Sequence, residues 1–186
     1  MKIEKFLATL QKHSGPQRAN RYDVFLPEFP GFETAGEELN NLCRSVQVPG
    51  KDINVIERKI NPLTSESAGG YDINNISLQF TETADSYVFR YFENWLNLIV
   101  DPETKLSGYK NDYAKDIRIR NKYDVAVQYD LETGGVKDKT TRNRELILTR
   151  CWPRTRPEIT YSDKERDSII EITIELSVTD YKVKYV

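Results

Sequence analysis

Alternation of apolar and polar residues is clearest at the end of the chain. Every second residue from Ile170 to Val178 is apolar, and the positions between them hold Glu171, Thr173, Glu175, Ser177 and Thr179. This period of two is typical of a β-strand with one buried and one solvated face. After Asp180 the phase shifts, so that Tyr181, Val183 and Tyr185 continue the formerly polar side. The shift predicts a bulge or a change of packing partner in a strand much longer than the usual 5–6 residues or so.

Further alternating runs along the chain predict an antiparallel β protein of seven or eight strands. These runs are "RYDVFLP", "LCRSVQVPG", "DINVIERKI", "NISLQF", "DIRIR", "YDVAVQYDL" and "ELILTRCW". The residues from Pro27 to Glu38 read as a surface loop, and "ETGGVKDKTTRNR" reads as a long hairpin loop. The segment "NPLTSESAGGYD" has the Pro, Ser and Gly-Gly composition of a mobile or turn-rich stretch. These connections join neighbouring strands of the predicted sheet.

Two segments have the period of a helix. Apolar residues recur every three or four positions between Ile3 and Leu10, before Gly15-Pro16, and predict a short amphipathic N-terminal helix. A stronger apolar stripe runs from Val88 to Ile99, with Asp85 or Ser86 as the expected N-cap. The predicted fold class is therefore mainly β, α+β by content. We expect an antiparallel β-sandwich or barrel with one packed central helix and a short N-terminal helix.

Length and charge narrow the range of functions. A chain of 186 residues fits one well-cored domain, so residues 1–186 are expected to form a single domain. With 27 basic against 29 acidic residues there is no strong attraction to nucleic acid. The two cysteines, Cys43 and Cys151, are expected to be free thiols in a reducing compartment. The N-terminus lacks signal-peptide features and no apolar run is long enough to span a membrane, so synthesis in the cytoplasm without a membrane anchor is expected.

The sequence contains little that supports catalysis, a metal or a cofactor. His13 is the only histidine and neither cysteine has a second ligand nearby in sequence, so no metal site, cofactor or catalytic residue is expected. Glu171 and Glu175 share one strand face, as the two acids of a glycosidase would. They lack an aromatic sugar platform in phase with them, which favours a solvated face and a protein that is not an enzyme.

The final strand suggests an assembly role. Burying its five aliphatic side chains would stabilise the fold by about 1.5–3 kcal/mol each, before the loss of conformational entropy is subtracted. We therefore expect the apolar face to point inward. A long edge strand invites pairing with another chain. If identical subunits close their sheets around an axis, these edges are covered and the opposite face lines a bore. We therefore expect the lumen to be lined by Glu171, Thr173, Glu175 and Ser177. Such a surface repels polyanions, so DNA can pass without binding.

The order of features resembles the tail tube proteins of contractile-tailed bacteriophages. The resemblance is carried by "RYDVFLP", "LCRSVQVPG", "ERKINP", "ISLQFTETADSYVFRYFENWLNLI", "GYKNDYAKDIRI" and "CWPRTRPEITYSDKERDSIIEITIELSVTDY". Together these pieces cover nearly the whole chain. None of them is an invariant signature, so the specificity lies in their order.

The resemblance implies a structural subunit that assembles with itself. It implies hexameric rings stacked into the inner tube of a virion tail, with sheath, baseplate and tail-terminator proteins as partners. Family members touch the next ring through the segment after the Pro-Gly turn, which falls here on Lys51 to Tyr71. The positions this places at the ring–ring interface are Lys51, Glu57, Arg58, Lys59, Asn61 and Tyr71. The loop before the central helix and "RTRPEIT" are further candidates.

Two alternatives remain. The subunit can instead start the tube at the baseplate, or form the inner tube of a related contractile injection machine such as type VI secretion. A different class is a small β-barrel that binds an apolar ligand or hydrolyses a sugar. Replacing Glu171 and Glu175 with Gln separates this class, because it abolishes hydrolysis but leaves tube assembly largely intact.

Overall fold

The computed structural model describes residues 2–12, 19–60, 63–122, 128–129, 136–137, 144–156, 159 and 169–185. Four helices lie in these segments: α1 (Lys2–Lys12), α2 (Ala35–Leu42), α3 (Tyr87–Ile99) and α4 (Lys110–Tyr113). The strands are β1 (Tyr22–Phe25), β2 (Cys43–Gln47), β3 (Lys51–Ile60), β4 (Leu63–Ile73), β5 (Ile76–Thr81), β6 (Lys115–Asn121), β7 (Gln128–Tyr129), β8 (Val136–Lys137), β9 (Arg144–Pro153), β10 (Glu171–Ser177) and β11 (Asp180–Tyr185). His13, Asn61, most of "YDVAVQYDL" and most of the loop between β7 and β9 lie outside the described residues.

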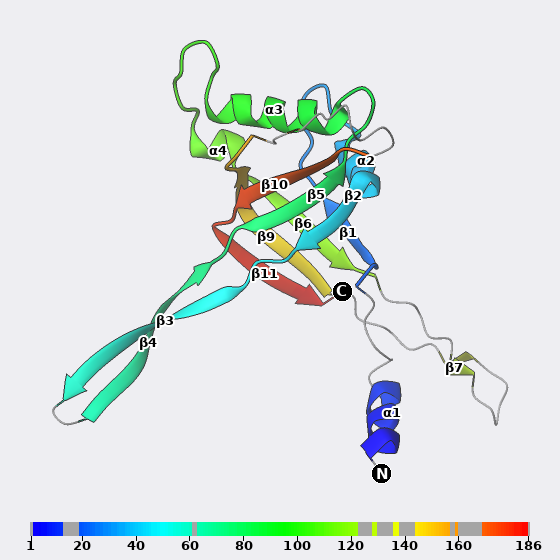
Figure 1. The fold of residues 1–186 in the computed structure, drawn as a ribbon, viewed down its shortest axis with the longest axis vertical. Coiled ribbons are helices and arrows are strands. Elements are labelled where there is room, and N and C mark those ends of the chain that lie inside the picture. The colour runs from blue at the N-terminus through cyan, green and yellow to red at the C-terminus, as the bar shows by residue number, and fades with distance from the viewer. Residues whose placement is uncertain are drawn as a thin grey trace.

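Seven strands form one antiparallel sheet in the order β1-β6-β9-β10-β5-β2, with β11 also paired to β9. The sheet folds into two layers through β9, which pairs with β6 and β11 over its first part and with β10 at its end (Figure 1). Arg150 adopts φ 54° where β9 changes partners. We call the two halves the β2–β5–β10 layer and the β1–β6–β9–β11 layer. The predicted mainly β, antiparallel fold class is confirmed.

The predicted phase shift in the last strand is a change of pairing partner. β10 pairs with β5 along its length and with the end of β9 only at Leu176 and Ser177. The chain then turns at Val178-Thr179, and β11 pairs with β9 from Asp180↔Thr149 to Tyr185↔Arg144. A single run of sequence therefore crosses from one layer to the other.

The core lies between the two layers and is closed by α3. Ile172, Ile174 and Leu176 of β10 are fully buried, as the alternation predicts. The rings of Phe80 and Phe92 join β5 to α3 at a centroid distance of 5.6 Å. The buried residues of α3 are Val88, Tyr91, Phe92 and Trp95. Each of the two buried polar rings has a hydrogen-bond acceptor: Tyr91 Oη donates to Pro27 O at 2.6 Å and Trp95 Nε1 to Tyr113 O at 2.8 Å.

The residue expected to cap α3 does not do so. Ser86 occupies the N-cap position in the left-handed region, φ 56°, and its side chain makes no capping hydrogen bond. The amides of Val88 and Phe89 instead donate to the carboxylate of Glu82, at 3.1 and 3.0 Å, and the amide of Tyr87 donates to Thr83 Oγ1. Asp85 is bound to Arg90 and accepts from Thr83. A carboxylate from the end of β5 therefore replaces the local cap, as suits a helix N-terminus.

Two segments differ from the expected connections. Residues 63–73, expected to be turn-rich, form strand β4, which pairs with β3 along its whole length. The expected loop from Pro27 to Glu38 ends in helix α2, which buries Ala35 and Leu39. A strand that buries neither face needs no alternating apolar residues. The segment that forms β4 therefore has the composition of a turn although it is a strand. Helix α2 was missed because two buried positions in eight residues make a weak period.

Helix α1 forms as predicted, but its apolar side is uncovered in the described structure. Ile3 is 74% exposed and Phe6 62%. In Figure 1 the helix lies apart from the sheet. Among the described residues, no helix combines the length and apolarity needed to cross a bilayer.

Candidate assembly surfaces

The solvent side of the β2–β5–β10 layer is a continuous polar surface. Glu171, Thr173 and Glu175 are exposed and Ser177 is half-buried, as the alternation predicts. The register places Thr81, Gln79 and Ser77 of β5 beside the first three. We call this surface the polar face and define it by Ser45, Gln47, Ser77, Gln79, Thr81, Glu171, Thr173, Glu175 and Ser177.

Hydrogen bonds across three strands order the polar face. Ser45 Oγ donates to Gln79 Oε1 at 3.1 Å, and Gln79 Nε2 donates to Glu171 Oε2 at 2.5 Å. At the margin of the face, Arg44 Nε donates to Thr81 Oγ1 at 2.7 Å. These hydrogen bonds fix the positions of the polar side chains relative to one another. Glu175 is an exposed carboxylate without an ion pair in the described structure.

The solvent side of the other layer has the opposite charge. Among its acids, Asp23 and Glu145 are nearly buried and are paired with Lys122 at 2.6 Å and Arg120 at 3.1 Å, and exposed Asp116 accepts a hydrogen bond from the amide of Arg150 at 2.9 Å. Three exposed cations remain without an ion pair among the described residues: Arg118, Lys182 and Lys184. We call this surface the cationic face. This face is not predicted by the sequence, because its charges come from β6 and β11, which are distant from each other along the chain.

Strands β3 and β4 form a two-stranded arm that leaves the body of the molecule (Figure 1). Almost every residue of this hairpin is exposed. Five of the residues expected at the ring–ring interface lie on it: Lys51, Glu57, Arg58, Lys59 and Tyr71. The sixth, Asn61, lies outside the described residues. Within the described part of the chain, Glu57, Arg58 and Lys59 have no ion pair, so their charges are open to another molecule.

The root of the hairpin is fixed to the body by polar contacts. Tyr71 Oη donates to Asp180 Oδ1 at 3.2 Å, and Lys51 Nζ lies 3.5 Å from the centre of the Tyr71 ring. At the same end, Asn74 Nδ2 donates to Asp52 Oδ2 at 3.1 Å. Lys51 and Tyr71 thus have contacts within the chain, and the hydrogen bond from Tyr71 to Asp180 links the arm to β11.

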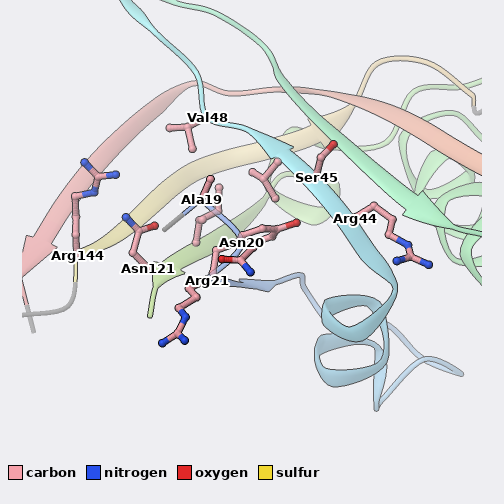
Figure 2. A pocket seen from close by; sticks show the side chains of 11 residues that line it. Ala19, Asn20, Arg21, Arg44, Ser45, Val48, Asn121 and Arg144 are labelled. Atoms are coloured by element: carbon pink, nitrogen blue, oxygen red, sulfur yellow. The ribbon is translucent and has the colours of Figure 1, made fainter. Parts of the chain in front are cut away.

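A groove opens between the end of β2 and the inner side of the β1–β6–β9–β11 layer. A hollow of about 510 Å³ lies against Tyr22, Val46, Val48 and Ile119. A smaller one of about 180 Å³ continues it past Pro49, Leu146, Tyr181 and Val183. Figure 2 shows Arg144 and Arg44 at opposite ends of the larger hollow, with Asn121 between Arg144 and the apolar wall. We call the two hollows together the Arg144 groove.

The charge of the Arg144 groove comes from its arginines. Burial, together with the neighbouring Cys43 thiol, raises the pKa of Tyr22 to about 12, so this ring in the groove wall carries no charge at neutral pH.

The thiols of both cysteines also have raised pKa values. Burial raises the pKa of Cys43 to about 11 and that of Cys151 to about 12. Both cysteines are free and stay protonated at neutral pH. Among the described residues, no group of three or more His, Cys, Asp or Glu is placed to hold a metal ion.

The segment "RTRPEIT" is only partly described. Arg156 is tied to α3 through an ion pair to Glu93 at 3.1 Å and lies 5.1 Å over the ring of Phe89. This end of the segment therefore packs on its own helix. The rest of the segment, apart from Ile159, lies outside the described residues.

Comparisons with known proteins agree with this architecture. Residues 17–184 match the family described as phage tail tube protein. Among curated proteins, none matches the sequence. The fold is similar to the tube-terminating cap of the anti-feeding prophage, with TM-score 0.59 and 15% identity over 92% of each chain.

Two further solved structures share the fold. A chain of the anti-feeding prophage baseplate has TM-score 0.56 and 13% identity, over 92% of this chain and 97% of that chain. A chain of the sheath–tube complex of an extracellular contractile injection system, PVC, has TM-score 0.56 and 16% identity, over 92% and 93%. The family match covers far more than half of the chain. The protein therefore belongs to the phage tail tube protein family, whose members are structural proteins and not enzymes.

Proposed function

We propose that residues 1–186 act as one tail-tube-like domain that assembles with itself into stacked rings, the inner tube of a contractile tail. The family match over residues 17–184 is the observation that carries this proposal. The rings are hexameric, as the resemblance to contractile-tailed phages implies. The finished tube belongs to the virion tail and is built from subunits made in the host cytoplasm.

Unpaired strand edges support closure into a ring. In the described sheet, β1, β2 and β11 each pair with a strand on one side only. Such edges favour pairing with other chains unless they are covered. Symmetric closure around an axis covers them and leaves one layer facing the bore.

The polar face suits the bore better than the cationic face does. DNA sliding past Glu171, Thr173, Glu175 and Ser177 meets carboxylates and hydroxyl groups, which offer phosphate little attraction. The cationic face would instead hold phosphates through Arg118, Lys182 and Lys184 and slow passage. With the polar face inward, α3 lies on the outer side, because it packs on the opposite side of β5 through Phe80 and Phe92. The outer side is where a sheath binds.

Negative-stain electron microscopy of the purified protein tests assembly. Rings or tubes with a central channel are the expected result. A chain that remains monomeric at high concentration contradicts the proposal.

A second role has support from the fold comparisons. The chain resembles a tube cap and a baseplate chain about as well as a tube chain, with TM-scores of 0.59, 0.56 and 0.56. The subunit can therefore start a tube at the baseplate, or belong to a contractile injection machine. Adding purified sheath or baseplate proteins separates these roles. A polymer elongates and accepts sheath along its length, whereas an initiator forms one ring that binds the baseplate.

A further inference from the structure

The hairpin carries an unfavourable charge pair when it is free. Glu57 of β3 lies directly opposite Glu66 of β4. Both carboxylates are exposed and neither has a hydrogen bond or ion pair in the described structure. Like charges directly opposite each other destabilise a strand pair. This arrangement becomes favourable when a cation from another molecule lies between them.

The same side of β3 is apolar nearer the root. Alternation places Ile53 and Val55 on the side of Glu57, and they are 55% and 57% exposed. Their partners across the hairpin are Tyr71 and Ala68. A two-stranded hairpin with nothing packed on it is at most marginally stable in water. The arm therefore presents an apolar patch followed by an acidic pair, with exposed Lys59 beyond it on the same side of β3.

The Arg144 groove has the complementary order of features. Its wall is apolar, formed by Tyr22, Val46, Val48 and Ile119, and exposed Arg144 lies at one end without an ion pair in the described structure. Asn121 Nδ2 is buried there and has no acceptor among the described atoms. Acidic side chains entering the groove would satisfy both groups.

The hairpin cannot occupy the groove of its own chain. Its root is held by the hydrogen bond from Tyr71 to Asp180, and the arm projects away from the sheet (Figure 1). A strand of ten residues extends about 33 Å, which is far enough to reach an adjacent subunit. Helix α1 is a poorer occupant, because its sequence has three lysines and one glutamate and would meet the arginines with like charge.

We propose that the hairpin of one subunit binds in the Arg144 groove of a neighbouring subunit, with Glu57 and Glu66 against Arg144 and with Ile53 and Val55 on the apolar wall. The inference rests on the proposed self-assembly and names the surface that receives the arm. Hairpin and groove are different surfaces of the same chain, so the contact is head-to-tail and repeats from copy to copy.

Charge reversal tests the contact. Arg144→Glu alone, and Glu57→Arg with Glu66→Arg, are each expected to raise the concentration needed for assembly at least about tenfold, by the loss of a charge-assisted contact. The triple variant, which carries all three changes, is expected to assemble within about threefold of wild type, because the pairing is restored with its signs exchanged. Sedimentation and negative-stain microscopy give the readout, with circular dichroism melting to confirm folding.

Matched variants serve as controls. Lys110→Glu reverses the charge of an exposed lysine that lies outside the groove and outside the candidate interface segments. It is expected to assemble as wild type does. Deleting residues 2–12 is also expected to leave assembly intact, and loss of assembly on that deletion would show that α1 fills the groove instead.

The outcomes separate this contact from the proposed function. If wild type and all charge variants assemble alike, the proposed binding of the hairpin in the Arg144 groove is wrong, while the proposed self-assembly stands. If Arg144→Glu and the double variant Glu57→Arg with Glu66→Arg both fail, and the triple variant also fails although it folds, the direct pairing is wrong. If wild type stays monomeric, the proposed self-assembly and the proposed binding of the hairpin in the groove are both wrong.

Discussion

Glu82 shows how a residue outside a helix determines where that helix begins. It follows β5 directly, and its carboxylate accepts hydrogen bonds from the amides of Thr83, Val88 and Phe89. Free amides at a helix N-terminus attract negative charge. The sequence pointed to Asp85 or Ser86 because capping residues normally adjoin the helix. In the structure, the carboxylate of Glu82, just after the end of β5, takes the place of a cap next to the helix.

Replacing Glu82 with Ala is expected to lower the free energy of unfolding by about 1–2 kcal/mol, because it leaves the helix amides without their acceptor. Ser86→Ala is expected to change it by less than about 0.5 kcal/mol, since the Ser86 side chain caps nothing. Urea denaturation followed by circular dichroism measures both values. Equal effects of the two substitutions would contradict this account of the cap.

Gly108 permits a close approach between the loop after α3 and the end of that helix. Its amide donates to Ile99 O at 2.9 Å, and a Cβ at this position would lie 2.5 Å from Leu98 O. We expect Gly108→Ala to lower the free energy of unfolding by about 1–3 kcal/mol, because the added Cβ forces the backbone to move. Gly36→Ala is the control: an added Cβ meets only atoms at 3.8 Å, and helix propensity favours Ala. Thermal melting compares the two, and a stable Gly108→Ala variant would refute the close approach.

Among the elements, those with a buried face were predictable. β10 and α3 have strong periods because each buries one side against the core, as Ile174 and Trp95 show. β4 was missed because neither of its faces is buried and its Ser, Gly and Ala residues resemble a loop. The apolar residues of β3 read correctly as a strand. Sequence alone does not reveal that they face solvent, because Ile53 and Val55 have the same alternation as core residues.

Tyr71 is expected to orient the hairpin rather than to stabilise the fold. The hydroxyl of exposed Tyr71 donates to half-buried Asp180 at 3.2 Å, so Tyr71→Phe is expected to change the free energy of unfolding by less than about 1 kcal/mol. The loosened root should slow assembly and speed hydrogen exchange in Lys51–Asn54. Tyr109→Phe removes the hydroxyl of a tyrosine that is 84% exposed and serves as the control. Unchanged exchange at the root in Tyr71→Phe would argue against an orienting role.

For the whole molecule, the sequence predicted the part of the polar face that β10 supplies. That part was predictable because a single strand with regular alternation supplies Glu171, Thr173 and Glu175. The cationic face and the Arg144 groove each combine strands that are distant in sequence. Their composition depends on which strands pair, and β9 pairs with three different strands. Such surfaces emerge only from topology.

Reversing charge on one layer at a time tests which layer lines the bore. In assembled tubes, Glu171→Lys with Glu175→Lys is expected to retain DNA that wild-type tubes release, because a cationic bore binds phosphates with displacement of counterions. Retention should fall steeply between about 50 and 200 mM salt. Glu171→Gln with Glu175→Gln should assemble and release DNA, since it adds no positive charge.

Lys182→Glu with Lys184→Glu provides the matched control on the cationic face, and co-sedimentation of short DNA with tubes gives the readout. If the polar face lines the channel, this control leaves DNA passage unchanged, because both lysines point to the opposite side of the subunit. If wild-type tubes retain DNA and only the lysine variant releases it, the cationic face lines the channel. The orientation of α3 would then be reversed as well, with the helix turned toward the axis instead of toward a sheath.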